Sequence, residues 1–299
     1  MKWRIPAKTF LLGEYAAVAG ESAIVLTTSP CFELSLVNDA TTVQGIHPES
    51  PAGQWWVHHR MPGQGLIWHD PYQGRGGLGA SSAQFLAVYL ASCYLLHVVP
   101  NRKAMLDAYY QSAWRGEGLR PSGYDVLAQS QHRCVYINRQ RNIIKPYDWG
   151  FKDISFLLLH SGQKLATHYH LQKATLPNSI NQLAATVDLA QAAFEQMNSE
   201  WLVQAVNTYQ QQLADLHLVA PHSLQHLNTF KTQPEVLAVK GCGALGADVL
   251  LLIVPSNCLK AKVKDLRSEG WTILATSDDL YAGWALMKNN PHKTLEILP

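Results

Sequence analysis

The sequence predicts an α+β protein, because strand-like and helical segments follow one another without the strict alternation of a doubly wound sheet. Apolar residues alternate with polar ones over 32–36, and 154–160 and 249–254 are apolar runs of strand length. Segment 81–99 is apolar almost all round and contains no proline, which indicates a helix buried in the core. These segments together predict a large mixed core.

Segment 183–218 has helical periodicity and is rich in Ala and Gln, so we expect one or two helices there. Pro146 and Gly150 punctuate the chain just before the 154–160 strand. We therefore expect two domains, at residues 1–150 and 151–299. By contrast, residues 38–76 are rich in Pro, Gly, His and Trp, and the pairs Trp55-Trp56 and His58-His59 predict a short hairpin or capping loop.

Composition narrows the class of partner. The formal charge is +2 and no Lys/Arg run exceeds a pair, which argues against a nucleic-acid surface. The longest apolar stretch, 85–100, is interrupted by Ser92 and Cys93, so we expect no membrane span. Five scattered cysteines without a CxxC pair predict reduced thiols and a cytoplasmic protein. The histidines at 58–59 and 168–170 lack the spacing of metal ligands, which favours surface positions.

The glycine-rich segment 74–83, GRGGLGASSA, leads directly into the predicted buried helix. Glycines let backbone N–H groups approach an anion, and a helix N-terminus adds unpaired donors and a positive dipole end. The segment therefore predicts a phosphate cradle, although a tight turn with a serine N-cap has the same residues. It is not a P-loop, because GxxxxGK[ST] is absent.

Four segments in one order resemble the motifs of the GHMP kinases. GLGASSA at 77–83 is similar to their GLGSSAA phosphate loop, and PAKTFLLGEYAAVAG at 6–20 to their PGKxxLxGEYxVxxG segment. PSGYD at 121–125 resembles the segment with the catalytic aspartate, and KGCGALGAD at 240–248 resembles the KxSGAGGGD loop. SGQKLAT at 161–167 is a weaker fifth match to the [ST]GxKxxT turn.

This resemblance implies a GHMP kinase fold, in which an N-terminal ribosomal-protein-S5-like domain packs on a C-terminal ferredoxin-like α/β domain. It implies an ATP-dependent small-molecule kinase that uses Mg²⁺, as a monomer or homodimer. The catalytic residues would be Asp125, as base or orienting group, and Lys8, which would keep the carboxylate ionised and counter developing charge.

The resemblance also assigns the ATP phosphates to the first glycine segment. The phosphate-binding residues would be Gly77, Gly79, Ala80, Ser81 and Ser82. Ser81 would contact Mg²⁺ together with Glu117, if AWRGE at 113–117 aligns with the family's A-aromatic-x-G-E; a solvated loop carboxylate is the alternative for Glu117.

A small anionic metabolite is the expected acceptor. The residues that the resemblance places around it are Glu14, Tyr15, Ser122, Lys164, Gly243 and Ala244. Arg120 is a further candidate for its carboxylate or phosphate, although a lone basic residue is more often solvated. Leu245 and Ala247 replace glycines of the family's second loop, so positive φ at these positions would be strained.

Three features resemble the forms more usual in phosphomevalonate kinases, which implies phosphomevalonate as the acceptor: GEY, SGYDV and the terminal Asp248 of the second loop. Pro121 points instead to mevalonate kinase, which is the second interpretation. A diphosphomevalonate decarboxylase ranks third, because those enzymes lack the GEY segment. A GHMP-fold protein that binds a metabolite without catalysis is an alternative from another class, motivated by Leu245 and Ala247.

Overall fold

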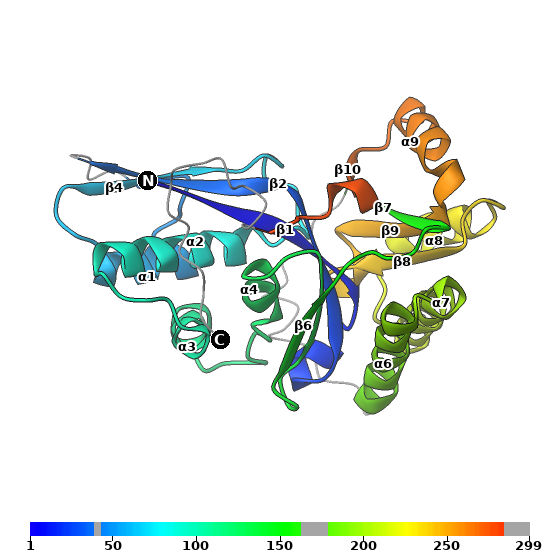
Figure 1. Ribbon diagram of the computed structural model, residues 1–299, viewed down its shortest axis with the longest axis horizontal. Helices are drawn as coiled ribbons and strands as arrows, with labels where there is room; N and C mark the ends of the chain where they lie inside the picture. Colours follow the sequence, from blue (N-terminus) through cyan, green and yellow to red (C-terminus); the bar gives the residue numbers. More distant parts are fainter. Residues whose placement is uncertain (39–42, 163–178, 284–299) are drawn as a thin grey trace.

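The computed structural model describes residues 1–38, 43–162 and 179–283. It contains two β-sheets flanked by helices, which confirms the predicted α+β class. In Figure 1 the first sheet and α1–α4 form one half of an elongated molecule, and the second sheet with α6–α9 forms the other. The division into domains at residue 150 stays a prediction.

The first sheet has six strands in the order β3-β4-β2-β5-β6, and β1 pairs with β2. Its strands are β1 (Lys2–Leu12), β2 (Ala23–Asn38), β3 (Val43–Gln44), β4 (Gln64–His69), β5 (Cys134–Asn138) and β6 (Ile143–Tyr147). The long β2 includes the predicted 32–36 strand and pairs antiparallel with β1, β4 and β5. It therefore forms the spine of this half.

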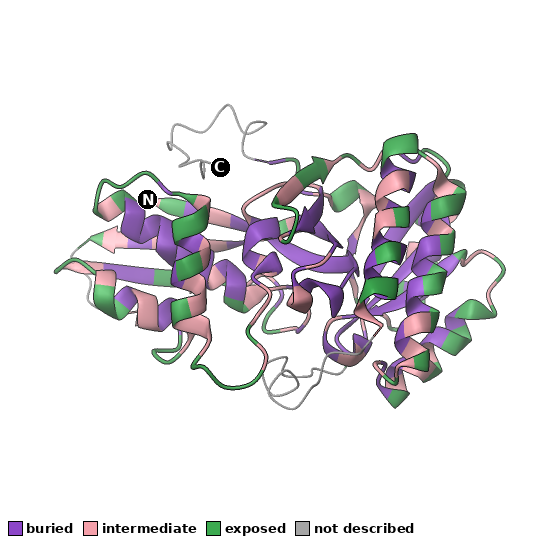
Figure 2. Ribbon diagram, turned by 90° about the horizontal axis from the view of Figure 1, so that it is seen from below, coloured by how far each residue is buried: buried purple, intermediate pink, exposed green. Residues whose placement is uncertain are grey.

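The helices of the first half include one that is buried almost completely. They are α1 (Pro51–His59), α2 (Ala80–Leu95), α3 (Arg102–Ala113) and α4 (Tyr124–Gln129), and the 3-10 turn η1 (Ala16–Ala19) follows β1. Buried residues lie on every side of α2, which packs on β1 and β2 and confirms the predicted core helix. Figure 2 shows the strands and α2 mostly buried, with exposed residues on the outer helices.

The predicted hairpin or capping loop at residues 55–59 is wrong, because these residues belong to α1. Ser50 caps the helix by accepting a hydrogen bond from the Gly53 amide, and Pro51 occupies the first turn. A Cβ at Gly53 would lie 2.2 Å from the His47 carbonyl oxygen, so this glycine permits close packing instead of breaking the helix. The helix start signal of Ser50 and Pro51 thus decides the local structure, although the composition of residues 38–76 is typical of a loop.

The second sheet has the antiparallel order β10-β7-β9-β8. Its strands are β7 (Ile154–His160), β8 (Ala238–Cys242), β9 (Val249–Pro255) and β10 (Ile273–Thr276). The strands predicted at 154–160 and 249–254 are therefore confirmed as β7 and β9. Short 3-10 turns also occur: η2 (Ala244–Gly246), η3 (Ser256–Cys258) and η4 (Ser277–Asp279).

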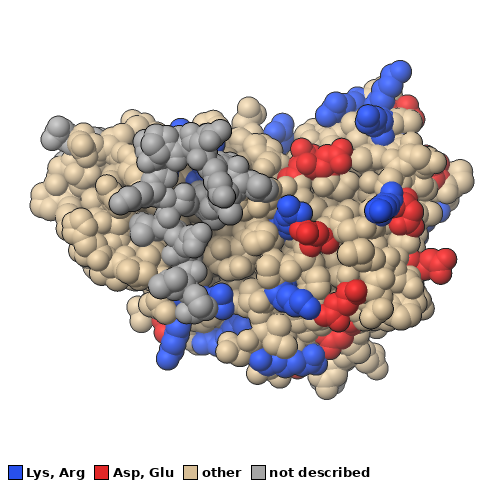
Figure 3. Space-filling model, viewed as in Figure 1, with Lys and Arg blue, Asp and Glu red and all other residues tan. Residues whose placement is uncertain are grey.

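Helices cover the second sheet as α6 (Ile180–Gln196), α7 (Ser199–Asp215), α8 (Pro221–Lys231) and α9 (Leu259–Ser268). The helical segment 183–218 is thus two helices, because the Asn198 side chain caps α7 by accepting from the Trp201 amide. No helix in the described ranges is long and apolar enough to cross a bilayer. Over this half, acidic and basic side chains lie side by side on the face in Figure 3.

Candidate active site

Lys8 and Asp125 form the centre of the candidate site. Lys8 projects from β1, and its Nζ lies 3.0 Å from Oδ1 of Asp125 in the first turn of α4. The lysine side chain is 9% exposed and the carboxylate 32%. The pair therefore has a buried cation and a carboxylate that can meet a ligand. The structure brings together the two residues that the motifs assigned to catalysis.

Hydrogen bonds fix the turn that carries Asp125. The Ser122 hydroxyl accepts from the Tyr124 amide at 3.2 Å, and Gly123 has φ 75° directly before α4. The Tyr124 hydroxyl donates to the Glu21 carbonyl at 2.7 Å and accepts from the Arg139 amide at 2.9 Å. Ser122, predicted to bind substrate, thus orients the beginning of α4.

The first glycine segment packs tightly against the side chains of Lys8 and Gln129. Gly79 has φ 76°, and a Cβ there would lie 2.6 Å from Cγ of Lys8 and 3.0 Å from Nε2 of Gln129. Nε2 of Gln129 donates to the carbonyls of Gly79 and Pro6 at 3.1 and 2.9 Å. Since only glycine tolerates both the backbone angle and the contact, Gly79 holds the loop beside Lys8.

The two serines after Gly79 differ in their surroundings. Ser82 is buried and its hydroxyl donates to the Gly79 carbonyl at 2.9 Å, whereas Ser81 is exposed in the first turn of α2. Ala80 begins the helix. Of the two hydroxyls that the sequence left open, Ser82 is used by the backbone and Ser81 faces outward.

Glu117 lies exposed in the loop between α3 and α4, where its carbonyl accepts from Nε1 of Trp114 at 3.0 Å. The structure records no contact between Glu117 and Ser81, so the shared magnesium site stays a prediction. Within the described residues, no group of three or more His, Cys, Asp or Glu side chains is arranged to hold a metal ion.

Glu14 pairs with Lys240 of β8, and both side chains are buried. Burial raises the pKa of the Glu14 carboxyl, and the charge of Lys240 opposes that rise. Oε2 of Glu14 is buried without a hydrogen-bond partner in the structure. A residue predicted to contact substrate thus also joins the two sheets.

Tyr15 makes a second contact between the halves, because its hydroxyl accepts from the Leu245 amide at 3.2 Å. Burial raises the pKa of Tyr15 to about 12. Leu245 has φ 52°, so the left-handed conformation of a glycine loop persists with a leucine, while Ala247 has the ordinary φ of −88°. The strain expected at both positions is thus present at Leu245 alone.

The second glycine turn, 243–248, meets the first glycine segment. A Cβ at Gly77 would lie 2.7 Å from Cγ2 of Val249 and 2.8 Å from Cβ of Asp248. Gly243 has φ 89° and Ala244 is buried. The turn therefore supports the first glycine segment from the side of β9. Lys164 lies outside the described residues.

Three further residues of the site had no role assigned from the sequence: Gln129, Lys240 and Arg139. Gln129 is a buried polar residue at the end of a short helix, and Lys240 opens the KGCGALGAD segment. Gln129 and Lys240 are buried beside the motifs and Arg139 is partly buried, and a sequence shows such burial poorly.

No family model and no curated protein matches the sequence, whereas solved structures match along nearly the whole chain. The Streptococcus pneumoniae phosphomevalonate kinase in complex with phosphomevalonate and AMPPNP has a TM-score of 0.75 and 15% identity, covering 92% of this chain and 99% of its own. The Methanococcus jannaschii mevalonate kinase has a TM-score of 0.71 and 14% identity, covering 92% of this chain and 97% of its own.

The chain has the GHMP kinase fold. A third structure with this fold, the Lactococcus lactis galactokinase complexed with galactose, matches with a TM-score of 0.66 and 11% identity over 91% of this chain and 92% of its own. The GHMP kinase fold expected from the four motifs is thereby confirmed. Low identity leaves the reaction to be argued from the residues themselves.

Proposed function

We propose that this protein is an ATP-dependent small-molecule kinase whose acceptor is a metabolite of the mevalonate pathway. Phosphomevalonate is the first candidate for this acceptor. The observation that carries the proposal is the Lys8–Asp125 pair, held beside the glycine segment that opens α2. The Lys8 amide donates to the Leu78 carbonyl at 3.0 Å, which ties the pair to that segment. Phosphoryl transfer needs this combination of anion binding and acceptor activation.

In the proposed reaction, an oxygen of the acceptor bonds to the γ-phosphorus of ATP while the bond from that phosphorus to ADP breaks. Asp125 orients the acceptor and takes the proton of a hydroxyl, and Lys8 counters the negative charge that develops. The first-turn amides of α2 bind phosphate oxygens. The exposed hydroxyl of Ser81 suits Mg²⁺, as does the carboxylate of Glu117, and the ion would neutralise the triphosphate.

The preference for phosphomevalonate rests on GEY, SGYDV and Asp248, and on the likeness to a phosphomevalonate kinase in complex with its acceptor. Mevalonate kinase is the second candidate, favoured by Pro121 and by a similar likeness in fold. A decarboxylase or a non-catalytic binding protein remain further alternatives; the left-handed Leu245 favours the latter.

A coupled ADP-release assay over mevalonate, phosphomevalonate, diphosphomevalonate and a sugar panel tests the proposal. We expect phosphomevalonate to give the highest kcat/KM. A mevalonate preference would replace the assignment with mevalonate kinase. If no acceptor stimulates ADP release above the rate with ATP alone, the proposed activity is wrong.

A further inference from the structure

Two arginines flank one tyrosine ring beside the loop that carries Asp125. Cζ of Arg120 lies 4.4 Å and Cζ of Arg139 lies 5.5 Å from the centre of the Tyr110 ring. The two guanidinium carbons are thus no further apart than the sum of these distances. Neither arginine forms an ion pair with any carboxylate in the described part of the chain.

We propose that Arg120 and Arg139 bind the anionic end of the acceptor, a carboxylate or phosphate group, and thereby select anionic metabolites over neutral sugars. This inference rests on the proposed kinase function, because it places the acceptor beside Asp125. A guanidinium presents paired N–H donors that match the two oxygens of a carboxylate or phosphate. Two such groups beside one ring carry a combined formal charge of +2.

The position of Arg139 is set by backbone contacts of the β5–β6 turn. Its amide donates to the carbonyl of Gly20 at 3.0 Å, and one guanidinium nitrogen donates to the Ser122 carbonyl at 3.0 Å. Since the carbonyl uses one N–H of the five on a guanidinium, other donors stay available for a ligand. The arginine is therefore oriented before any ligand binds.

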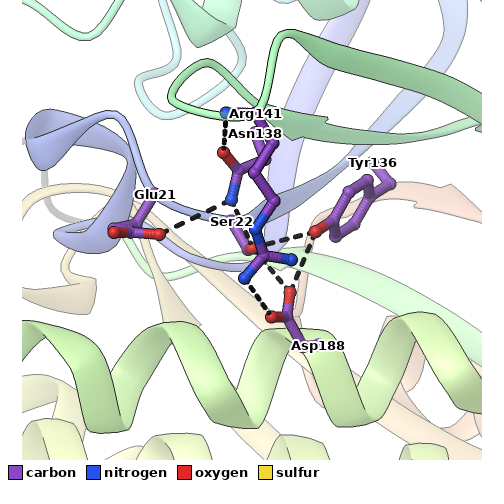
Figure 4. A network of polar contacts seen from close by, with 6 residues as sticks. All are labelled: Glu21, Ser22, Tyr136, Asn138, Arg141 and Asp188. Carbon is purple, nitrogen blue, oxygen red and sulfur yellow. Dashed lines mark hydrogen bonds and ion pairs between the residues drawn. The ribbon is translucent and has the colours of Figure 1, made fainter.

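A buried network holds the same turn from below (Figure 4). Asn138, fully buried, accepts from the Arg141 amide at 2.8 Å and donates to the Ser22 hydroxyl at 2.9 Å. Ser22 in turn donates to Asp188 on α6, which also accepts from the Tyr136 hydroxyl at 2.9 Å. The turn is thereby anchored to both halves of the molecule, which limits the entropy lost when a ligand binds.

Ser122 connects the arginine pair to the turn that carries Asp125. The Ser122 carbonyl accepts from Arg139 and from the Tyr110 hydroxyl, the latter at 2.8 Å. Ser122 precedes Asp125 by three residues, so their Cα atoms are at most about 11 Å apart. A metabolite with a short carbon chain between its reacting group and its anionic end fits this span.

One carboxylate near the ring is Asp107, which is exposed on α3 one turn before Tyr110, and the Glu21 carboxylate acts on the neighbouring Tyr124. Burial raises the pKa of Tyr110, while Arg139 and Arg120 oppose the rise and Asp107 adds to it. Asp107 forms no ion pair with either arginine. The positive charge of the pair is therefore not neutralised by this neighbour.

The test compares Arg120→Ala and Arg139→Lys with Arg115→Ala, an exposed arginine of the same loop. Calorimetry with phosphomevalonate, mevalonate and galactose measures Kd without turnover, and ADP release gives KM. For Arg120→Ala we expect Kd and KM of the anionic acceptors to rise by about 10–100-fold, the worth of a hydrogen bond to a charged group. The KM for ATP and the melting temperature should not change, and Arg115→Ala should match the wild type.

Arg139→Lys keeps the positive charge but removes the paired N–H donors of the guanidinium. If charge dominates, acceptor affinity should fall less than in Arg120→Ala, and if the paired donors matter, it should fall by a comparable factor. Either loss of affinity supports the site. Loss for both anions identifies the carboxylate as the bound group, and loss for phosphomevalonate alone identifies the phosphate. Unchanged Kd and KM in Arg120→Ala would overturn the inference. So would an equal loss with galactose. Because binding needs no turnover, a failure of ADP release would overturn the kinase proposal alone.

Discussion

Lys240 and Glu14 form a buried ion pair that joins β8 of the second sheet to the turn that follows β1 of the first. Glu14 lies six residues beyond Lys8 along the chain, and Tyr15 contacts the second glycine turn from the same segment. The relative position of Lys8 and that turn thus depends on this junction. Removing one charge of a buried pair leaves the other without a partner.

We therefore expect Lys240→Met to lower the free energy of unfolding by about 3–5 kcal/mol. Urea titration followed by tryptophan fluorescence measures the change. Lys145→Met is the matched control, because Lys145 pairs with Glu195 on the surface and should cost no more than about 1 kcal/mol. Equal stability of the two variants would mean that the buried pair contributes nothing to joining the sheets.

The next prediction concerns Gly79, whose missing side chain makes room for Lys8. Gly79→Val should abolish ATP binding and also lower the melting temperature, since the new side chain collides with Lys8 and Gln129 at positive φ. Gly74→Val has a similar φ of 79° but open space around its Cβ, so it serves as the control for backbone strain alone. Equal melting temperatures in the two variants would contradict the packing argument.

The sequence predicted β7 with its observed bounds, because an apolar run of strand length left little choice. It also placed Lys8, Asp125 and the glycine segment in one site, since the motif order carries that information. It missed α1, where local capping by Ser50 outweighed composition. Gln129 and Lys240 could not be assigned roles, because their burial depends on contacts across the fold.

Ser81 and Ser82 should respond differently to alanine. Ser81→Ala should weaken Mg²⁺-ATP binding and lower turnover partially without a change in stability, because its hydroxyl is exposed and proposed to face the metal. Ser82→Ala should cost about 1 kcal/mol of stability, since its hydroxyl bonds to the Gly79 carbonyl. Turnover measured against Mg²⁺ concentration checks the first, and thermal unfolding the second. An unchanged Mg²⁺ dependence in Ser81→Ala would exclude the metal contact.

The identity of the acceptor can be tested through the Lys8–Asp125 pair, because an alcohol and a phosphate monoester differ in acidity. An alcohol keeps its proton near neutral pH, so a mevalonate kinase should lose about 10²–10⁴-fold in kcat when Asp125 becomes Asn, the range for general-base catalysis. A phosphate monoester has a second pKa of about 6 and is already largely ionised.

For phosphomevalonate, therefore, Asp125 would mainly orient the acceptor, and Lys8 would face a dianion. Loss of its ammonium then removes the charge that offsets this dianion and the developing transition state. We expect Lys8→Ala to reduce kcat/KM more than Asp125→Asn when phosphomevalonate is the acceptor, with melting curves to show that both variants fold. Should Asp125→Asn be the more damaging change and mevalonate the better acceptor, the protein is a mevalonate kinase, because only an un-ionised hydroxyl needs the carboxylate as a base.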